Sequence, residues 1–210
     1  MPTRILIADD HAIYREGLKQ VIGMTVNMAV VDEAANGQEL LSKIQKNDYD
    51  IAILDISMPG RNGLDVLVEL KNIKPKLPVL VLSMHPEEQY ALRAYKSGAS
   101  GYLTKGCPSE DLLDALHKIS LGKKYVSSAL AESLVNGLSE PKHQDILHSL
   151  SNREYQVMSM IASGKTVGKI ALELALSVKT ISTYRSHILS KLNMENNAEL
   201  TRFVIENQLL

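Results

Sequence analysis

The chain has 210 residues, of which 45% are hydrophobic, and a formal net charge of −1. This length suits one large domain or two small ones with a buried core, and no apolar run approaches the ~18 residues that a membrane span needs. Because Cys107 is the only cysteine, an intrachain disulfide and a cysteine-based zinc site are excluded, and the first residues leave no room for a signal peptide. We therefore expect a cytoplasmic protein that makes no membrane contact.

Residues 1–122 alternate between short apolar runs and amphipathic stretches. The apolar runs predict strands at 4–8, 29–31, 51–54, 79–82 and 102–105, and a helical pattern follows each of them. Five strands that alternate with five helices indicate an α/β fold, a doubly wound five-stranded parallel sheet with helices on both faces. The last helix is expected to begin at a cap formed by Pro108 and Ser109 and to stop at Gly122.

Five polar side chains stand at the carboxyl ends of the predicted strands. They are Asp9, Asp10, Asp55, Ser83 and Lys105. The carboxyl ends of parallel strands lie at one edge of a sheet, so these residues can converge although they are distant in sequence. Three neighbouring carboxylates repel one another unless a cation intervenes, and Mg²⁺ is the divalent ion that best suits such oxygen ligands.

This set of residues meets the needs of phosphoryl transfer onto a carboxylate. Asp55 would be the nucleophile, Lys105 and the metal would neutralise the phosphoryl oxygens, and Ser83 would donate a hydrogen bond. A simpler interpretation exists for each residue alone, because Asp55 also suits a turn or a helix cap, and an isolated acidic pair or lysine is usually surface charge. The occurrence of all five at successive strand ends favours the functional interpretation.

Residues 1–122 resemble the receiver domains of bacterial two-component response regulators, which have a flavodoxin-like fold. The matching features are Asp9-Asp10, Asp55 with Met58-Pro59-Gly60 and Gly63, Ser83, and Gly98-Ala99 leading to Tyr102 and Lys105. The resemblance implies that Asp55 accepts a phosphoryl group from a sensor histidine kinase. It also implies that Ser83 and Lys105 contact this group and that Tyr102 changes rotamer when Ser83 moves. The implied ligands of Mg²⁺ are Asp9, acting largely through water, Asp10, Asp55 and Ser57.

Residues 123–148 lose the alternation of strand and helix and are predicted to be a linker that contains a short helix at 128–138. The stretch 139–145 is polar and is interrupted by Pro141, which places the flexible boundary near 137–148. His143 and His148 have no third ligand nearby, so a solvated linker is favoured over a metal site.

Residues 149–210 are mildly basic and carry a helical pattern. They hold seven basic and five acidic side chains, a balance of +2, whereas residues 1–122 hold 13 and 16, a balance of −3, which hints at a polyanionic partner. Four helices are predicted, starting at the capping box of Ser151 and Glu154, after Thr166, after Ser177, and at Asn196 or Asn197. A short helix, a tight turn and a longer helix form a helix-turn-helix, whose second helix enters the major groove of DNA.

Residues 149–207 resemble the helix-turn-helix domain of the NarL/LuxR class, although charge alone would also allow a plain surface helix of a small bundle. The matching features are Leu150-Ser151-x-Arg153-Glu154, Ile161-Ala162-x-Gly164, Lys169-Ile170-Ala171, Leu176-Ser177-x-x-Thr180-Ile181 and Lys191-Leu192. The resemblance implies that bases are read by Ser182, Thr183 and Ser186. The implied DNA-binding surface also includes Lys179, Thr180, Arg185 and Lys191, with the three cations on the DNA backbone.

Together the two regions, 1–122 and 149–210, predict a DNA-binding transcriptional response regulator. Phosphorylation of Asp55 would shift an existing equilibrium towards a homodimer that binds paired half-sites of double-stranded promoter DNA, with RNA polymerase as a further partner. We expect no turnover of an external substrate, although the protein would be able to release its own phosphoryl group. Two alternatives stay open: a phosphatase that forms an aspartyl-phosphate, which Ser57 disfavours because a second carboxylate is absent there, and a regulator whose C-terminal helices bind a protein.

Overall fold

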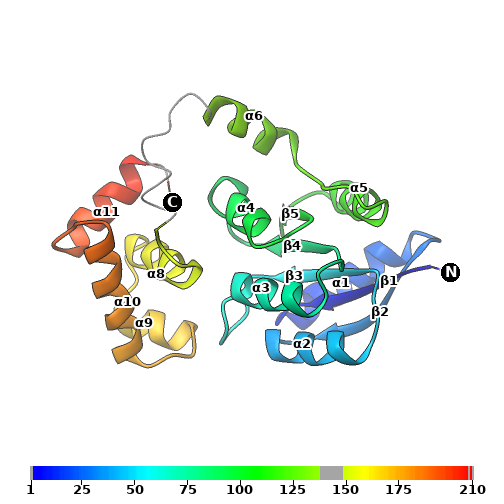
Figure 1. Cartoon of the computed structure of the whole chain (residues 1–210), viewed down its shortest axis with the longest axis horizontal. Helices are drawn as coiled ribbons and strands as arrows, with labels where there is room; N and C mark the ends of the chain where they lie inside the picture. The colour runs from blue at the N-terminus through cyan, green and yellow to red at the C-terminus, as the bar shows by residue number, and fades with distance from the viewer. Residues whose placement is uncertain (1, 138–148, 208, 210) are drawn as a thin grey trace. The chain divides into compact units, whose positions relative to one another are not determined.

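The computed structural model describes residues 2–137, 149–207 and 209, and the chain divides into two compact units, residues 1–131 and 132–210 (Figure 1). The predicted flexible boundary near 137–148, with His143 and His148, falls almost entirely outside the described residues. The predicted domain limits at 122 and 149 stay predictions.

The first unit contains a five-stranded sheet. Its strands are β1 (Thr3–Ala8), β2 (Met28–Ala34), β3 (Ile51–Asp55), β4 (Val79–Ser83) and β5 (Gly101–Thr104). They pair in the order β2-β1-β3-β4-β5, and every pairing is parallel. The predicted doubly wound sheet is therefore confirmed. Strand β2 is longer than the predicted 29–31. It is an edge strand of the sheet, where charged side chains are common, and Asp32 and Glu33 interrupt the apolar run from which the strand was predicted.

Five helices follow the strands, and a sixth begins the connector. They are α1 (Ala12–Gly23), α2 (Gly37–Lys46), α3 (Gly63–Ile73), α4 (Glu87–Lys96), α5 (Ser109–Ser120) and α6 (Ser128–Gly137). The prediction for the start of α5 needs one correction. Its N-cap residue is Pro108, which has no side-chain donor or acceptor and makes no capping hydrogen bond, so the cap expected from Pro108 and Ser109 is not formed.

One face of the sheet is covered by α1 and α5. Side chains that alternate along the strands, including Ile5 and Ile7 of β1, form a buried cluster with Leu18 and Ile22 of α1 and with Leu116 of α5. The strands β3 and β4 are buried at every residue. A strand buried on both faces does not alternate, which explains the continuous apolar runs in the sequence.

The chain stays packed against the first unit beyond α5. Tyr125 belongs to the same buried cluster, and its backbone N–H donates to the carbonyl of Ser100 over 2.9 Å. The hydroxyl of Tyr95 donates to the carbonyl of Tyr125. Ser127 then accepts the N–H of Leu130 over 3.0 Å, as an N-cap residue does, so α6 begins directly on this packed segment.

The second unit contains the helices α8 (Asn152–Ala162), α9 (Val167–Glu173), α10 (Val178–Lys191) and α11 (Asn197–Glu206). Their N-cap side chains are those of Ser151, Thr166, Ser177 and Asn196, and each accepts a backbone N–H in the first turn, as the sequence predicts. Ser151 and Glu154 form the reciprocal capping box. The described residues include no helix with the length and apolarity that crossing a bilayer requires.

Candidate phosphoryl-transfer site

The carboxyl edge of the sheet gathers an acidic cluster. Asp9 follows β1 and Asp55 ends β3, and the two carboxylates are only 2% and 1% exposed. Asp9, Asp10, His11 and Asp55 each offer one ligand atom within 4.8 Å of the others. The structure thus brings together the three carboxylates expected from the sequence, and it adds His11, an imidazole that the sequence reasoning did not assign.

Lys105 joins two of these carboxylates. It follows β5, and its Nζ lies 2.7 Å from Asp9 Oδ2 and 2.6 Å from Asp55 Oδ2. Burial alone would lower the pKa of Lys105, but its hydrogen bonds with Asp55 and Asp9 raise it overall. Burial raises the pKa of Asp55, although the bonds from Lys105 and the Ser57 amide oppose the rise. The ammonium is therefore held charged at the centre of the cluster.

The remaining acceptor atoms suit a hard divalent ion. Asp55 Oδ1 accepts the backbone N–H of Ser57 over 2.7 Å. Among the described residues, the buried atoms Asp10 Oδ1 and Ser57 Oγ have no hydrogen-bond partner, although His11 Nδ1 lies 3.0 Å from Asp10 Oδ1, within ion-pair distance. Three carboxylates and one ammonium sum to a charge of −2, which a divalent cation would neutralise. This oxygen-rich set fits the expected magnesium site.

The loop after β3 requires glycine at position 63. A Cβ on Gly63 would lie 2.3 Å from the Cα of Ile56 and 2.9 Å from the carbonyl oxygen of Asp55. The neighbouring Asn62 caps α3 by accepting the N–H of Leu64 over 2.8 Å. This close approach of backbone to backbone fixes the position of Asp55 at the end of its strand.

Ser83 and Tyr102 are linked through the loop that follows β4. Asp55 pairs in register with Leu82, so Ser83 lies next along the neighbouring strand. The Oγ atom of Ser83 accepts the N–H of His85 over 3.0 Å, and the hydroxyl of Tyr102 donates to the His85 carbonyl over 2.9 Å. Both side chains are fully buried, and burial raises the pKa of Tyr102 although its hydrogen bond with Ser83 opposes the rise. Ser83 and Tyr102 therefore both bond to the backbone of His85, at its N–H and its carbonyl respectively.

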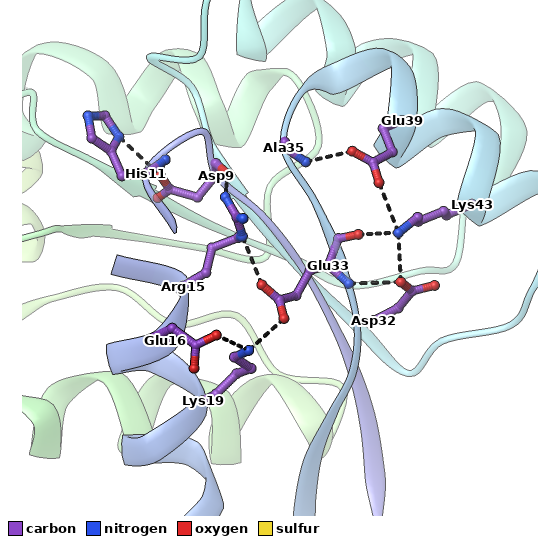
Figure 2. Close-up of polar contacts among 10 residues, drawn as sticks. All are labelled: Asp9, His11, Arg15, Glu16, Lys19, Asp32, Glu33, Ala35, Glu39 and Lys43. Carbon is purple, nitrogen blue, oxygen red and sulfur yellow. Dashed lines mark hydrogen bonds and ion pairs between the residues drawn. The ribbon is translucent and has the colours of Figure 1, made fainter. Parts of the chain in front are cut away.

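Figure 2 shows how the loop after β1 is held. Arg15 of α1 donates from Nη1 to the carbonyl of Asp9 over 2.6 Å and from Nε to Glu33 Oε2 over 2.8 Å. The N–H of Asp9 donates to the carbonyl of Ala34 over 3.1 Å. The acidic loop is thus tied to the end of β2. The sequence reasoning did not identify Arg15. The only signal for it in the sequence is its position in the first turns of the helix that follows Asp9-Asp10, and that signal alone does not name a partner.

The predicted recognition helix is α10, and its sides differ as expected. Ile181, Ile188 and Leu192 are buried, whereas Tyr184 is only partly so. On the other side Lys179, Ser182, Thr183 and Ser186 are exposed. Thr180 is half-buried, and its hydroxyl lies 2.7 Å from that of the cap residue Ser177. The exposed members form a surface open to a partner.

Two of the predicted DNA-backbone cations have partners within the second unit. Arg185 donates from Nε to Asn197 Oδ1 over 2.5 Å. The Nζ of Lys191 lies 2.7 Å from Glu154 Oε2 and 3.1 Å from the carbonyl of Ser149. These contacts brace α10 against its neighbours. Lys179 is the predicted cation of this helix that is both exposed and without such a bond among the described residues.

The chain matches two protein families, one in each unit. Residues 5–117 match the response regulator receiver domain, and residues 148–204 match the bacterial regulatory proteins of the luxR family. The oxygen regulatory protein NreC of Staphylococcus haemolyticus is 35% identical over 214 residues, which cover 99% of each chain. Its counterpart in Staphylococcus epidermidis is 36% identical over 215 residues, again 99% of each.

The similar solved structures are also response regulators. RcsB of Salmonella enterica serovar Typhimurium, bound to the promoter rprA in the presence of phosphomimetic BeF3−, is 28% identical and aligns over 96% of this chain and 98% of its own, with a TM-score of 0.67. The response regulator ChrA of a heme-sensing two-component system is 29% identical over 100% of this chain and 99% of its own, with a TM-score of 0.53. The chain therefore belongs to the LuxR family of two-component response regulators.

Proposed function

We propose that Asp55 is the phosphoacceptor of this transcriptional regulator and that its phosphorylation by a sensor histidine kinase controls DNA binding through α10. The observation that carries the proposal is the cluster of Asp9, Asp10 and Asp55 around the ammonium of Lys105, in a chain that also holds a helix-turn-helix. The receiver family supports a kinase partner.

The chemistry begins with an in-line attack. A carboxylate oxygen of Asp55 attacks the phosphorus of a phosphohistidine, the new O–P bond forms, and the P–N bond breaks with its electrons returning to the kinase imidazole. Lys105 then transfers its hydrogen bond from Asp55 to an equatorial phosphoryl oxygen. Mg²⁺, held by Asp9, Asp10, Asp55 and Ser57, would supply further positive charge to these oxygens when bound.

Ser83 would transmit the effect of phosphorylation from Asp55 to the loop after β4. Its hydroxyl can donate to a phosphoryl oxygen, which draws it towards Asp55 and away from the N–H of His85. The His85 carbonyl is the acceptor of the Tyr102 hydroxyl, so the loop and the tyrosine move together. We propose that this shift favours the dimeric, DNA-binding form of an existing equilibrium.

The output is regulation of transcription. The exposed face of α10, with Lys179, Ser182, Thr183 and Ser186, is proposed to enter the major groove of double-stranded promoter DNA, each protomer of a dimer reading one half-site. The solved complexes of RcsB with DNA support this assignment. Such a regulator works at the chromosome, which makes the cytoplasm its proposed location, and RNA polymerase is its proposed further partner.

We further propose that the protein does not turn over an external substrate. Hydrolysis of an aspartyl-phosphate by a phosphatase profits from a second carboxylate that acts as acid and base. The position two residues after Asp55 holds Ser57 instead. Loss of the phosphoryl group from Asp55 would therefore be hydrolysis by water, which releases inorganic phosphate and returns the free carboxylate.

The proposal is tested with Asp55→Asn and with the matched control Asp48→Asn, which changes a carboxylate that is 91% exposed. Mass spectrometry after incubation with a phosphodonor should find one phosphoryl group in the wild type and in the control, and none in Asp55→Asn. Binding to promoter DNA should rise on phosphorylation in the first two alone. Phosphorylation or activation of Asp55→Asn equal to that of the wild type would refute the proposal.

A further inference from the structure

His11 lies against the acidic cluster, at the start of α1. It is the N-cap residue of α1, yet its side chain accepts no backbone N–H there. Instead its Nδ1 lies 3.0 Å from Asp10 Oδ1 and 3.2 Å from Asp9 Oδ1. Figure 2 shows the ring turned towards the Asp9 carboxylate. The imidazole is 64% exposed, so a ligand can reach it from solvent.

The spacing of these donor atoms matches that of neighbouring ligands on one metal ion. In an octahedral site with bonds of 2.0–2.1 Å, adjacent donors are about 3 Å apart. His11 Nδ1 and Asp10 Oδ1 have this separation, and Asp10 Oδ1 is the buried oxygen that has no hydrogen-bond partner among the described residues. A nitrogen and an oxygen are thus available side by side for one cation.

An imidazole changes which cation such a site prefers. Carboxylate, carbonyl and water ligands suit Mg²⁺ and Mn²⁺, whereas imidazole nitrogen suits iron, nickel, copper and zinc, and Mn²⁺ binds most weakly of the first-row transition ions. We propose that His11 is a ligand of the divalent ion and that it shifts the selectivity of this site from Mg²⁺ towards first-row transition ions, of which Mn²⁺, the weakest binder of the series, is the paramagnetic probe. This inference rests on the metal site of the proposed function and adds a residue and a selectivity to it.

A competing role for His11 makes the opposite prediction. If the imidazole only served as a counter-charge to Asp9 and Asp10, an incoming cation would have to displace it. Its removal would then strengthen the binding of Mg²⁺ and Mn²⁺ alike. A ligand role predicts instead that removal weakens Mn²⁺ binding and leaves Mg²⁺ binding little changed.

The experiment compares the full chain with His11→Ala and with the matched control His117→Ala, which removes an exposed imidazole on α5. Mn²⁺ binding is measured by electron paramagnetic resonance and Mg²⁺ binding by competition. We expect the dissociation constant for Mn²⁺ to rise about tenfold in His11→Ala, and that for Mg²⁺ to change by less than about threefold. The electron spin echo of bound Mn²⁺ should carry nitrogen modulation in the wild type and in His117→Ala, and should lose it in His11→Ala.

Two results would overturn the inference: no nitrogen modulation in the wild type, or an equal change of both dissociation constants in His11→Ala. Phosphorylation of Asp55 in the presence of Mg²⁺ is followed by mass spectrometry in the same samples. A wild type that is phosphorylated but lacks nitrogen modulation refutes the role of His11 alone. A wild type that is never phosphorylated refutes the proposed function itself.

Discussion

Lys105 pairs with two carboxylates that are almost completely buried, those of Asp9 and Asp55. Its own side chain is 5% exposed, and its Nζ contacts both Asp9 and Asp55. Taking one member from a buried ion pair leaves a charge without compensation, which costs far more than the pair contributes as a whole. The same ammonium therefore stabilises the fold and, in the proposed function, would stabilise the phosphoryl oxygens after phosphorylation.

Substitution of Lys105 by Met should lower the free energy of unfolding by about 3 kcal/mol in the absence of divalent ions. Mg²⁺ should restore more stability to Lys105→Met than it adds to the wild type, because the unpaired carboxylates of Asp9 and Asp55 bind the cation more tightly. Urea unfolding with EDTA and with Mg²⁺ measures both effects. Lys46→Met, which changes an exposed lysine of α2, serves as the control. An equal response to Mg²⁺ in all three proteins would contradict the proposed metal site.

At the scale of helices and strands, Glu154 connects two helices of the second unit. It closes the capping box of α8 with Ser151 and accepts the Lys191 ammonium at the end of α10. Burial alone would raise the pKa of Glu154, but the bonds from Lys191 and Ser151 lower it overall. A carboxylate whose pKa is lower in the folded state than in the unfolded state stabilises the fold above its unfolded value, and this stabilisation is lost as the pH falls through its folded value.

The second unit should therefore lose stability as the pH is lowered below the ordinary range of a glutamate. Ser151→Ala should reduce the free energy of unfolding by about 1 kcal/mol at neutral pH. Glu154→Gln should be less stable at neutral pH and should show a smaller further loss on acidification than the wild type. Urea unfolding followed by helical circular dichroism at pH 7 and pH 4 tests this. An identical pH dependence in Glu154→Gln would show that another group is responsible.

The sequence predicted elements well where the signal is local. The buried strands β3 and β4 appear as continuous apolar runs, and the helices α8 to α11 start at the capping residues that were expected. The convergence of Asp9, Asp55 and Lys105 followed from the parallel sheet alone. These features depend on hydrophobic periodicity, on cap chemistry and on topology, all of which a single sequence contains.

The features that were missed depend on contacts between residues far apart in the chain. Arg15 of α1 bonds to Glu33 of β2, and Tyr125 returns to the core beside Ser100. Arg185 and Lys191 look like free cations in the sequence but bond to other helices. No local pattern encodes such partners, since the same residue types also occur as solvated surface charge.

At the scale of the whole molecule, few cations of α10 remain for a polyanion. Because Arg185 and Lys191 are engaged, Lys179 should carry most of the electrostatic contact of this helix with DNA. Each neutralised phosphate contributes about −0.9 to the slope of log K against log salt concentration. Specific binding should therefore depend strongly on having two protomers on the DNA.

Lys179→Ala should reduce the magnitude of this slope by about 0.9 for each bound protomer. The measurement is a titration of phosphorylated protein with promoter DNA at several salt concentrations. Lys123→Ala, an exposed lysine of the first unit, should leave the slope unchanged. An unaltered slope in Lys179→Ala would assign the phosphate contacts to other residues.

The segment after α5 is fixed to the receiver unit by hydrogen bonds up to the start of α6. Ser127 caps α6 from the position before its first residue, and its hydroxyl also lies 2.6 Å from Oε2 of Glu87, the first residue of α4. Glu87 lies two residues after His85, whose backbone bonds to the side chains of both Ser83 and Tyr102. A displacement of α4 would therefore also displace Ser127 and, with it, the start of α6. If phosphorylation of Asp55 displaced α4, the start of α6 would be displaced with it, and the direction in which the chain leaves the first unit would change.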